Sequence, residues 1–280
     1  MDYLYISHHK DVNIFHFFSL EINAIYKLKP KHLFLEHYID NPVHRWRRDF
    51  IAALGVQVYV SAPTPNLPQK DLPINGWLYD SWTFVHYLPD RNIMEIPKIV
   101  RQNLGIQDSP SNIVFVKRDN SRVLYDLEGN LLENTLLKYI RNIKIVSFDN
   151  CTFKDQVSIM SNAAILISCH GAANTNVLFM PKKSMFIEIS FRNHWYCDPP
   201  CKEHFSGALD FKTKCNSHGL TYRPYYHKAD YHNLAKLCDI NYKEVSLEHA
   251  EEFLDGDINR INLRKIYVDH KKVLACININ

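Results

Sequence analysis

The chain is poor in glycine, has little net charge and lacks long apolar runs. It has 8 glycines among 280 residues, well below the ~7% of an average protein, so a glycine in a polar turn is informative. The net charge of +3 is too weak for a dedicated nucleic-acid binder, whose affinity comes largely from neutralising phosphates. No apolar run approaches the ~20 residues that span a bilayer, so we expect no membrane-spanning segment.

A secretory signal is also not evident, because residues 1–9 lack a basic segment followed by an apolar one. The 7 cysteines are an odd number in a chain long enough to fold without disulfides, which favours a reducing compartment. The 46% hydrophobic and 22% charged residues are ordinary for a folded protein. We therefore expect a folded, cytoplasmic protein.

Apolar runs and helical patterns alternate in both halves of the sequence, which is typical of parallel sheets covered by helices. The first half predicts strands at 3–7, 32–36 and 56–60 and helices at 13–28, 42–54 and 96–104. The second half predicts strands at 113–116, 143–148, 165–168 and 185–189 and helices at 133–140, 153–162 and 173–179. Beyond about residue 193 the alternation is lost.

A polar linker at 105–111 separates the two halves, and a domain of ~150 residues is typical, so we expect two domains. The sequence predicts an α/β protein with two Rossmann-like domains, residues 1–108 and 109–280, that face each other across a cleft.

The segment from Ser168 to Asn176 joins a buried strand to a helix and contains His170 and Gly171. A glycine here lets the backbone approach a ligand closely, and the amide groups of a helix start attract phosphate. Asn and Thr at a helix start also cap it without any ligand. The segment alone therefore indicates either a phosphate site or a capped turn.

Arg118 and Arg122 follow another strand directly, at the end of the sheet where open α/β sheets bind ligands. Forked guanidinium groups suit the oxygens of a diphosphate. The alternative is a solvated basic turn.

These motifs together resemble glycosyltransferase family 61. The resemblance covers residues 10–190 and rests on Arg118-x-x-Ser121-Arg122, Phe153-x-x-Gln156-Val157, His170-Gly171-Ala172-x-x-Thr175-Asn176, a strand ending in Glu188, and Asn13-x-x-His16. The family includes protein O-linked N-acetylglucosamine transferases and xylan xylosyl- and arabinosyltransferases. Asn174 departs from the family, which usually has an apolar residue there.

The resemblance implies a GT-B fold and an inverting transfer, without a metal or other cofactor, from a UDP-sugar to a hydroxyl of a glycan or glycoprotein. Residues 1–108 would form the acceptor-side domain and 109–280 the nucleotide-sugar-binding domain. The donor-binding residues that it implies are Arg118, Ser121, Arg122, His170, Gly171, Ala172, Thr175 and Asn176, with Glu188 on the ribose hydroxyls.

Inversion in one displacement needs a base on the side opposite the diphosphate, so the base is expected from the first domain. His16 and Glu21 are the candidates, with Asp80 third. Leu20 stands where the family carries its acidic residue, which keeps a second hypothesis open: a nucleotide-sugar or glycan-binding module without catalysis. A histidine in an apolar helix can equally be a core residue that donates to a carbonyl.

A compact cysteine and histidine cluster offers a third hypothesis, a zinc-stabilised interaction protein. His194, Cys197, Cys201 and His204 are residue types that bind zinc. Pro199 and Pro200 stiffen the loop between them against closing on one ion, so coincidence is the favoured interpretation.

Overall fold

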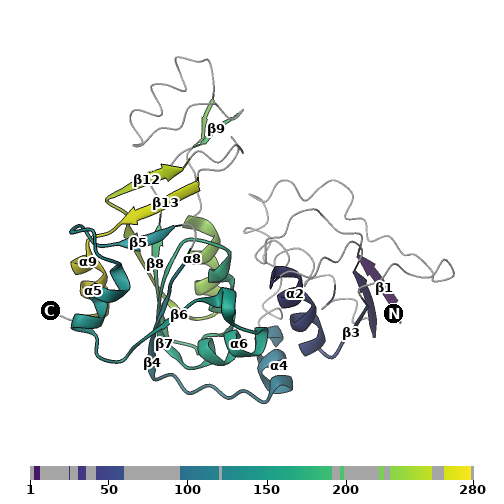
Figure 1. The fold of residues 1–280 in the computed structure, drawn as a ribbon. Coiled ribbons are helices and arrows are strands. Elements are labelled where there is room, and N and C mark those ends of the chain that lie inside the picture. The colour runs from purple at the N-terminus through teal and green to yellow at the C-terminus, as the bar shows by residue number, and fades with distance from the viewer. Residues whose placement is uncertain are drawn as a thin grey trace. The chain divides into compact units, whose positions relative to one another are not determined.

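The computed structural model describes residues 3–6, 25, 31–35, 42–59, 95–119, 122–190, 196–198, 221–223, 228–253 and 262–278 (Figure 1). The chain divides into two compact units. Unit 1 consists of residues 1–110, 148–162 and 172–182, and unit 2 of residues 111–147, 163–171 and 183–280. Two short segments from the second half of the sequence thus belong to the N-terminal unit.

Unit 1 contains a three-stranded parallel sheet with the strand order β1-β2-β3. Its strands are β1 (Tyr3–Ile6), β2 (His32–Leu35) and β3 (Gln57–Tyr59). Helix α2 (Pro42–Ala53) connects β2 to β3. Proline suits the first turn of a helix, and Gly55, with φ of +81°, follows its end. The strands and helix lie where the sequence predicts them.

Aromatic side chains form the core of unit 1. Trp46 and Phe50 of α2 contact Phe153 of α6 (Phe153–Ser161), and Phe50 and Phe153 contact Phe179 of η4 (Ala172–Phe179). The ring centroids of these pairs are 5.3–5.8 Å apart. Offset and edge-to-face rings at this spacing stabilise a core beyond their area burial. Helix α4 (Glu95–Leu104) also belongs to this unit.

The predicted helix at 153–162 begins with the expected capping box: the Thr152 hydroxyl accepts from the Asp155 amide, and the Asp155 carboxylate accepts from the Thr152 amide. The predicted helix at 173–179 differs in type, since η4 is a 3-10 helix. A short 3-10 turn (η3, Phe148–Asn150) precedes α6.

Unit 2 is built on a five-stranded sheet in which all strands are parallel. Its order is β11-β8-β7-β4-β6, with bounds Asn241–Ser246, Met185–Ser190, Ala163–Cys169, Asn112–Val116 and Ile143–Val146. Numbered along the chain, this is the doubly wound order 2-1-3-4-5. The strand order reverses between β4 and β7.

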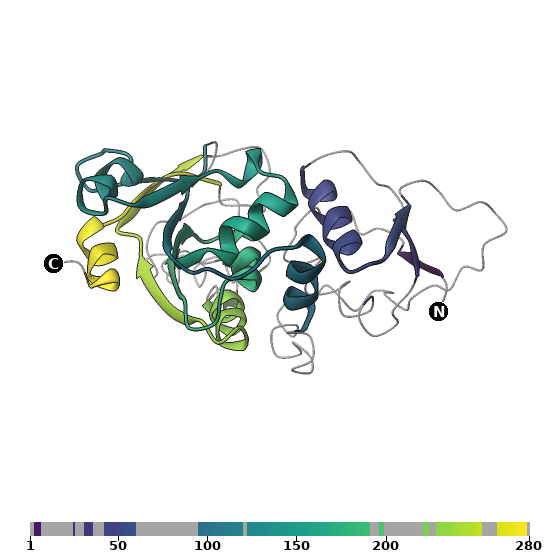
Figure 2. The same ribbon diagram turned by 90° about the horizontal axis from the view of Figure 1, so that it is seen from below.

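Helices lie on both sides of this sheet. Helices α5 (Leu132–Tyr139) and α9 (His270–Ile277) lie on one side, and α8 (Lys228–Leu237) lies on the other (Figures 1 and 2). Leu132, Leu136 and Val273 pack with Phe115 and Ile187 in one core cluster. Because side chains alternate along a strand, Glu188 points to the opposite face from Ile187.

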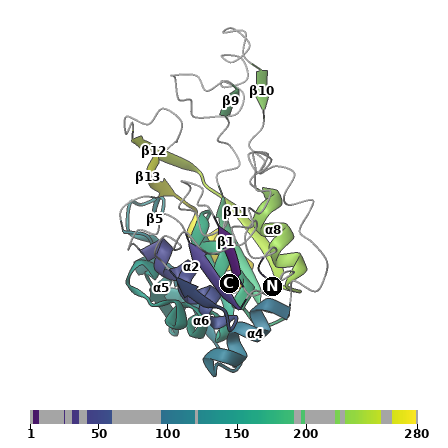
Figure 3. The ribbon, with the colours of Figure 1, turned by 90° about the vertical axis from the view of Figure 1, so that its right-hand side faces the viewer.

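Two small sheets complete the unit. Strands β12 (His249–Phe253), β13 (Asn262–Tyr267) and β5 (Val123–Tyr125) form one of them, and β9 (Tyr196–Asp198) and β10 (Thr221–Arg223) form the other (Figure 3). The sequence predicted none of these strands and none of α8, β11 and α9. All of them except β5 lie after residue 193, where the alternation is lost, and β5 has only three residues.

The α/β class with parallel sheets is therefore confirmed, while the GT-B arrangement across a cleft stays a prediction. The predicted helix at 13–28 lies outside the described residues apart from Ile25, which is helical and buried. Within the described part of the chain, no helix has the length and apolar character needed to cross a bilayer.

Candidate functional site

The carboxyl ends of β4 and β7 bring the two predicted motifs together. Val116, the last residue of β4, pairs with Ser168 near the end of β7. Arg118 follows the first strand by two residues, and His170 and Gly171 follow the second directly. Open α/β sheets bind ligands at this edge, where the strand order reverses. The fold of unit 2 therefore gives the sequence motifs the position that a ligand site requires.

Two guanidinium groups converge on Gly171. A Cβ atom at this position would lie 2.6 Å from Arg118 Nη1 and 3.1 Å from Arg122 Nη1. Arg122 Nη1 also donates a hydrogen bond of 2.8 Å to the carbonyl of His170. The missing side chain of Gly171 thus allows both cations to approach the backbone closely.

Arg122 has a left-handed backbone conformation with φ of 57°. This region is costly for a residue with a side chain, and such residues gather at functional sites. The Arg122 guanidinium reaches the loop after β7, where it donates to the His170 carbonyl. Ser121, the other predicted donor-binding residue of this turn, lies outside the described residues.

His170 is paired with a buried carboxylate. Its Nδ1 lies 2.7 Å from Glu188 Oε1, and the Tyr242 hydroxyl donates to Glu188 Oε2 at 2.6 Å. Glu188 has no exposed surface and His170 is buried. The ring of His170 also contacts the ring of Tyr231 edge-on, with centroids 5.2 Å apart. Strands β7, β8 and β11 and helix α8 all contribute to this cluster.

Two neighbouring groups are less suited to chemistry. Burial raises the pKa of the Cys169 thiol to about 12, although Arg122 and Arg118 oppose the shift, so the thiol stays protonated and is a poor nucleophile.

Lys117 forms an ion pair of 2.7 Å with Asp119. That contact raises the pKa of Lys117 and lowers the pKa of Asp119.

The other predicted donor-binding residues follow Gly171 in the sequence and belong to the segment 172–182 of unit 1. Ala172 is partly buried, and its carbonyl accepts a bond of 2.7 Å from the Thr175 hydroxyl. Asn176 Nδ2 donates to Gln156 Oε1 at 3.0 Å, and Gln156 donates in turn to the carbonyls of Phe148 and Cys151. Thr175 and Asn176 are fully buried. These contacts link η4 to α6 and η3, and a ligand-binding role for these residues stays a prediction.

Tyr242 and Tyr231 are members of the cluster that sequence reasoning missed. Tyr242 lies on β11, beyond the point where the alternation is lost, and its role depends on the pairing of β11 with β8. The only local signal is the period-2 spacing of Tyr242, Glu244 and Ser246, which is too short to distinguish a strand from a loop.

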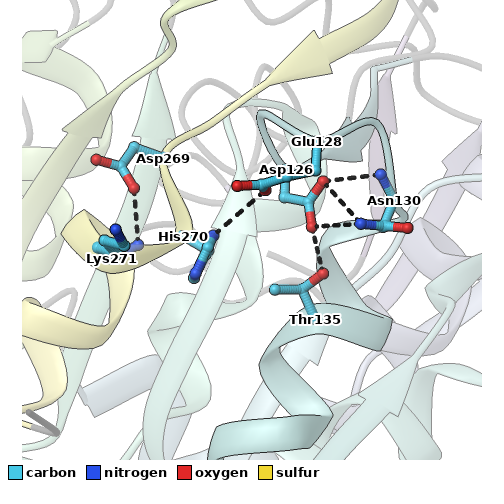
Figure 4. A network of polar contacts seen from close by, with 7 residues as sticks. All are labelled: Asp126, Glu128, Asn130, Thr135, Asp269, His270 and Lys271. Atoms are coloured by element: carbon cyan, nitrogen blue, oxygen red, sulfur yellow. Dashed lines mark hydrogen bonds and ion pairs between the residues drawn. The ribbon is translucent and has the colours of Figure 1, made fainter.

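One group of carboxylate and imidazole atoms among the described residues has the spacing of a metal site. The ligand atoms of Asp126, Glu128 and His270 lie within 4.8 Å of one another. Asp126 accepts bonds from the Thr135 hydroxyl and from the backbone and side chain of Asn130 (Figure 4). These donors occupy its oxygens, so the group has two available ligands and a metal usually needs more.

Several predicted residues lie outside the described part of the chain. His16, Glu21 and Asp80, the candidate bases, are among them, as are His194, Cys201 and His204 of the zinc hypothesis. Of Cys197 only the backbone, in β9, is described. Their roles stay predictions.

The family model for Glycosyltransferase 61 matches residues 2–187. Curated relatives match over shorter segments. The chain is 32% identical over 77 residues to the mouse protein O-linked-mannose beta-1,4-N-acetylglucosaminyltransferase 2, covering 28% of this chain and 13% of that protein. Its human counterpart matches at 32% identity over 92 residues, covering 33% of this chain and 16% of that protein.

The chain thus aligns with less than a fifth of these relatives' length. The family model extends through the arginine pair and the His170-Gly171 turn and ends one residue before Glu188. Since the match spans well over half of the sequence, the chain belongs to glycosyltransferase family 61.

Proposed function

We propose that this chain is an inverting, metal-independent glycosyltransferase that moves a sugar from a UDP-sugar to a hydroxyl of a glycan or glycoprotein. The observation that carries the proposal is the convergence of Arg118 and Arg122 on Gly171, beside His170, where the strand order reverses. The proposed donor-binding set also includes Ser121 and the start of η4.

Departure of a nucleoside diphosphate leaves negative charge that the enzyme must stabilise in the transition state. Two guanidinium groups can bind its oxygens through several charge-assisted hydrogen bonds. We propose that backbone amides at the start of η4 also donate to the same oxygens. The site therefore supplies, from side chains and backbone, the positive charge that a metal supplies elsewhere.

The sequence also contains a pattern that would favour the alternative, a metal-dependent mechanism. An Asp-x-Asp pattern, which holds the metal-bound diphosphate in the other major transferase fold, occurs at Asp255-Gly256-Asp257. It lies outside the described residues. UDP binding in EDTA, compared between the wild type and an Asp255→Asn/Asp257→Asn variant, separates the two mechanisms. Under the metal-independent mechanism, we expect the wild type and the variant to bind UDP in EDTA with equal affinity. Restoration of UDP binding by Mn²⁺ would show a metal-dependent site.

The acceptor is proposed from the relatives. Their names describe transfer of N-acetylglucosamine to O-linked mannose of proteins. This supports a sugar donor with a sugar-bearing acceptor here. We further propose that the two units form a GT-B enzyme in which residues 1–108 bind the acceptor and supply the base.

His16 is the first candidate for that base, followed by Glu21 and Asp80. Loss of a general base typically slows a reaction by ~10²–10⁴-fold. We expect His16→Ala to lose turnover of a UDP-sugar by this amount while keeping its UDP affinity and thermal stability. Removal of a base should slow turnover by at least ~10²-fold. A variant whose turnover stays within about threefold of the wild type would therefore identify His16 as structural.

The binding-module alternative rests on Leu20, which stands at the expected acidic position with Glu21 next to it. A protein of this kind binds UDP without turning over any UDP-sugar. A thermal-shift panel with UDP-, GDP-, CMP- and dTDP-sugars, followed by turnover of the best ligand, tests both functions, because a ligand of the native state raises its stability. Stabilisation by UDP-sugars with turnover supports the transferase, and stabilisation by none of them contradicts both functions.

We also propose that the protein works in a reducing compartment. Cys169 and Cys276 have free thiols in the structure. Thiol titration of the denatured protein should find most of the 7 cysteines free. Recovery of a single free thiol would indicate three disulfides and an oxidising compartment.

A further inference from the structure

Glu188 is a buried carboxylate whose two oxygens are both engaged. Oε1 accepts from His170 Nδ1 at 2.7 Å, and Oε2 accepts from the Tyr242 hydroxyl at 2.6 Å. The residue has no exposed surface. A buried charge of this kind needs strong partners, and these two bonds supply them. A ribose hydroxyl would have to share one of these oxygens with a bond that it already accepts.

The Glu188 contact determines the state of the His170 ring. Since a carboxylate only accepts, the proton of the shared hydrogen bond lies on His170 Nδ1. Phosphate oxygens also accept, so His170 can contact a diphosphate only as an imidazolium with a second proton on Nε2.

We infer that Glu188 is a positioning residue for His170: it holds Nδ1 so that Nε2 donates to the diphosphate of the donor, and Tyr242 holds Glu188. This inference rests on the proposed function. The arrangement matches the way a carboxylate orients a histidine that binds a metal, where loss of the carboxylate weakens binding by roughly 10–100-fold. The role replaces the ribose contact that the family resemblance implies for Glu188.

Glu188→Gln distinguishes the two roles when UDP and inorganic pyrophosphate are both titrated calorimetrically. A residue that acts through His170 affects both ligands, because both contain the diphosphate. A ribose contact affects UDP alone. Removal of a negative charge by itself would strengthen the binding of an anion. Weaker binding of both ligands is therefore a result that neither the ribose contact nor charge alone produces.

We expect Glu188→Gln to weaken UDP and pyrophosphate binding by the same factor, about tenfold. His170→Asn provides the second half of the test, because its amide still donates to Glu188 but has no group equivalent to Nε2. In the His170→Asn background, Glu188→Gln should cause no additional loss. A loss restricted to UDP, or one that persists in that background, overturns the inference.

Ser190→Ala is the matched control. Ser190 lies two residues along the same strand, and its hydroxyl donates to Glu244 of β11 at 2.5 Å. We expect this variant to bind both ligands like the wild type. Tyr242→Phe keeps the ring and removes the second bond to Glu188, so both affinities should fall by a smaller, equal factor.

The inference can fail separately from the proposed function. If the wild type binds neither UDP nor pyrophosphate, the proposed function fails. If it binds both and the folded Glu188→Gln variant binds both equally well, only the inference fails.

Discussion

Two histidine–carboxylate clusters among the described residues of unit 2 differ in what surrounds them. His170 Nδ1 lies 2.7 Å from Glu188, whose side chain is buried, and two guanidinium groups lie at the next residue. His270 Nδ1 lies 4.0 Å from Glu128, whose side chain is 63% exposed. Its other neighbour, Asp126, is occupied by Thr135 and Asn130.

The difference shows that residue type alone does not make a site. In the His270 cluster, Asn130 of the turn and Thr135 of α5 hold the Asp126 carboxylate (Figure 4), while the buried Nδ1 of His270 at the start of α9 makes no hydrogen bond. The His170 cluster lies at the carboxyl edge of a parallel sheet, where the guanidinium groups of Arg118 and Arg122 approach Gly171. The predictions below separate binding from stability in these two places.

Paired histidine substitutions should show the largest difference. His170→Ala leaves the Glu188 carboxylate buried without its main partner, which typically costs about 3–5 kcal/mol. His270→Ala should cost about 1 kcal/mol, a usual value for a point substitution. Urea unfolding of both variants measures these free energies. Equal destabilisation would mean that His170 is not the main partner of the buried Glu188 side chain.

His170→Asn sharpens this test, since its amide can still donate to Glu188. We expect it to recover most of the stability lost in His170→Ala without recovering UDP affinity. Recovery of both properties would make His170 a structural residue.

Paired glycine substitutions should separate affinity from stability. In Gly171→Ala the new Cβ would meet Arg118 Nη1 at 2.6 Å, and the flexible guanidinium can move away. UDP affinity should therefore fall several-fold with little change in the free energy of unfolding. Gly129 has φ of +85° and open space around it, so Gly129→Ala should cost about 1–2 kcal/mol of stability. Its UDP affinity should equal that of the wild type. Calorimetry and urea unfolding of both variants check this, and the reverse pattern would contradict the assigned roles.

The pH dependence of stability should depend on Asp126. Burial raises the pKa of its carboxyl, but hydrogen bonds from Thr135 and Asn130 outweigh that effect and bring the pKa below its ordinary value. The ionised form therefore stabilises the fold above about pH 4, and the stabilisation is lost as the pH falls through the lower, folded-state pKa.

Asp126→Asn should cost about 1–3 kcal/mol at pH 7, and less as the solution is acidified. Urea unfolding at pH 7, 5 and 3.5 measures the difference. A constant difference at all three values would contradict the lowered pKa. UDP affinity at pH 7 should be unchanged.

The fold was predictable from sequence where signals are local. Pro42 and Gly55 bound α2, Thr152 and Asp155 cap α6, and apolar runs mark β4, β7 and β8. The elements after residue 193 were not predictable, since β11 and β13 are stabilised by pairing with strands distant in sequence. For the same reason, no local signal assigns α6 and η4 to the N-terminal unit, because their contacts with α2 and α4 determine it.

The site was predictable in part. Four site residues follow apolar runs in the sequence: Arg118, Arg122, His170 and Gly171. Their position at one edge of the sheet could therefore be predicted, because the carboxyl ends of parallel strands meet there. Their convergence on one backbone position depends on the left-handed conformation of Arg122, which no pattern indicates. Glu188 was singled out, but its partners were not, because Tyr242 reaches it across a strand pair. Thr175 and Asn176 are polar residues that pack inward, which composition does not indicate.

The most direct test of the central claim is calorimetric titration of UDP in EDTA into the wild type and an Arg118→Ala/Arg122→Ala variant. Lys272→Ala, which removes a cation paired with Glu248 near the second cluster, controls for charge. Each arginine contact is worth about 1.5–3 kcal/mol, so the double variant should bind UDP at least 100-fold more weakly than the wild type. The control should bind within about threefold of the wild type, as expected for an exposed ion pair. Equal UDP affinity in the wild type and the folded double variant would contradict the account.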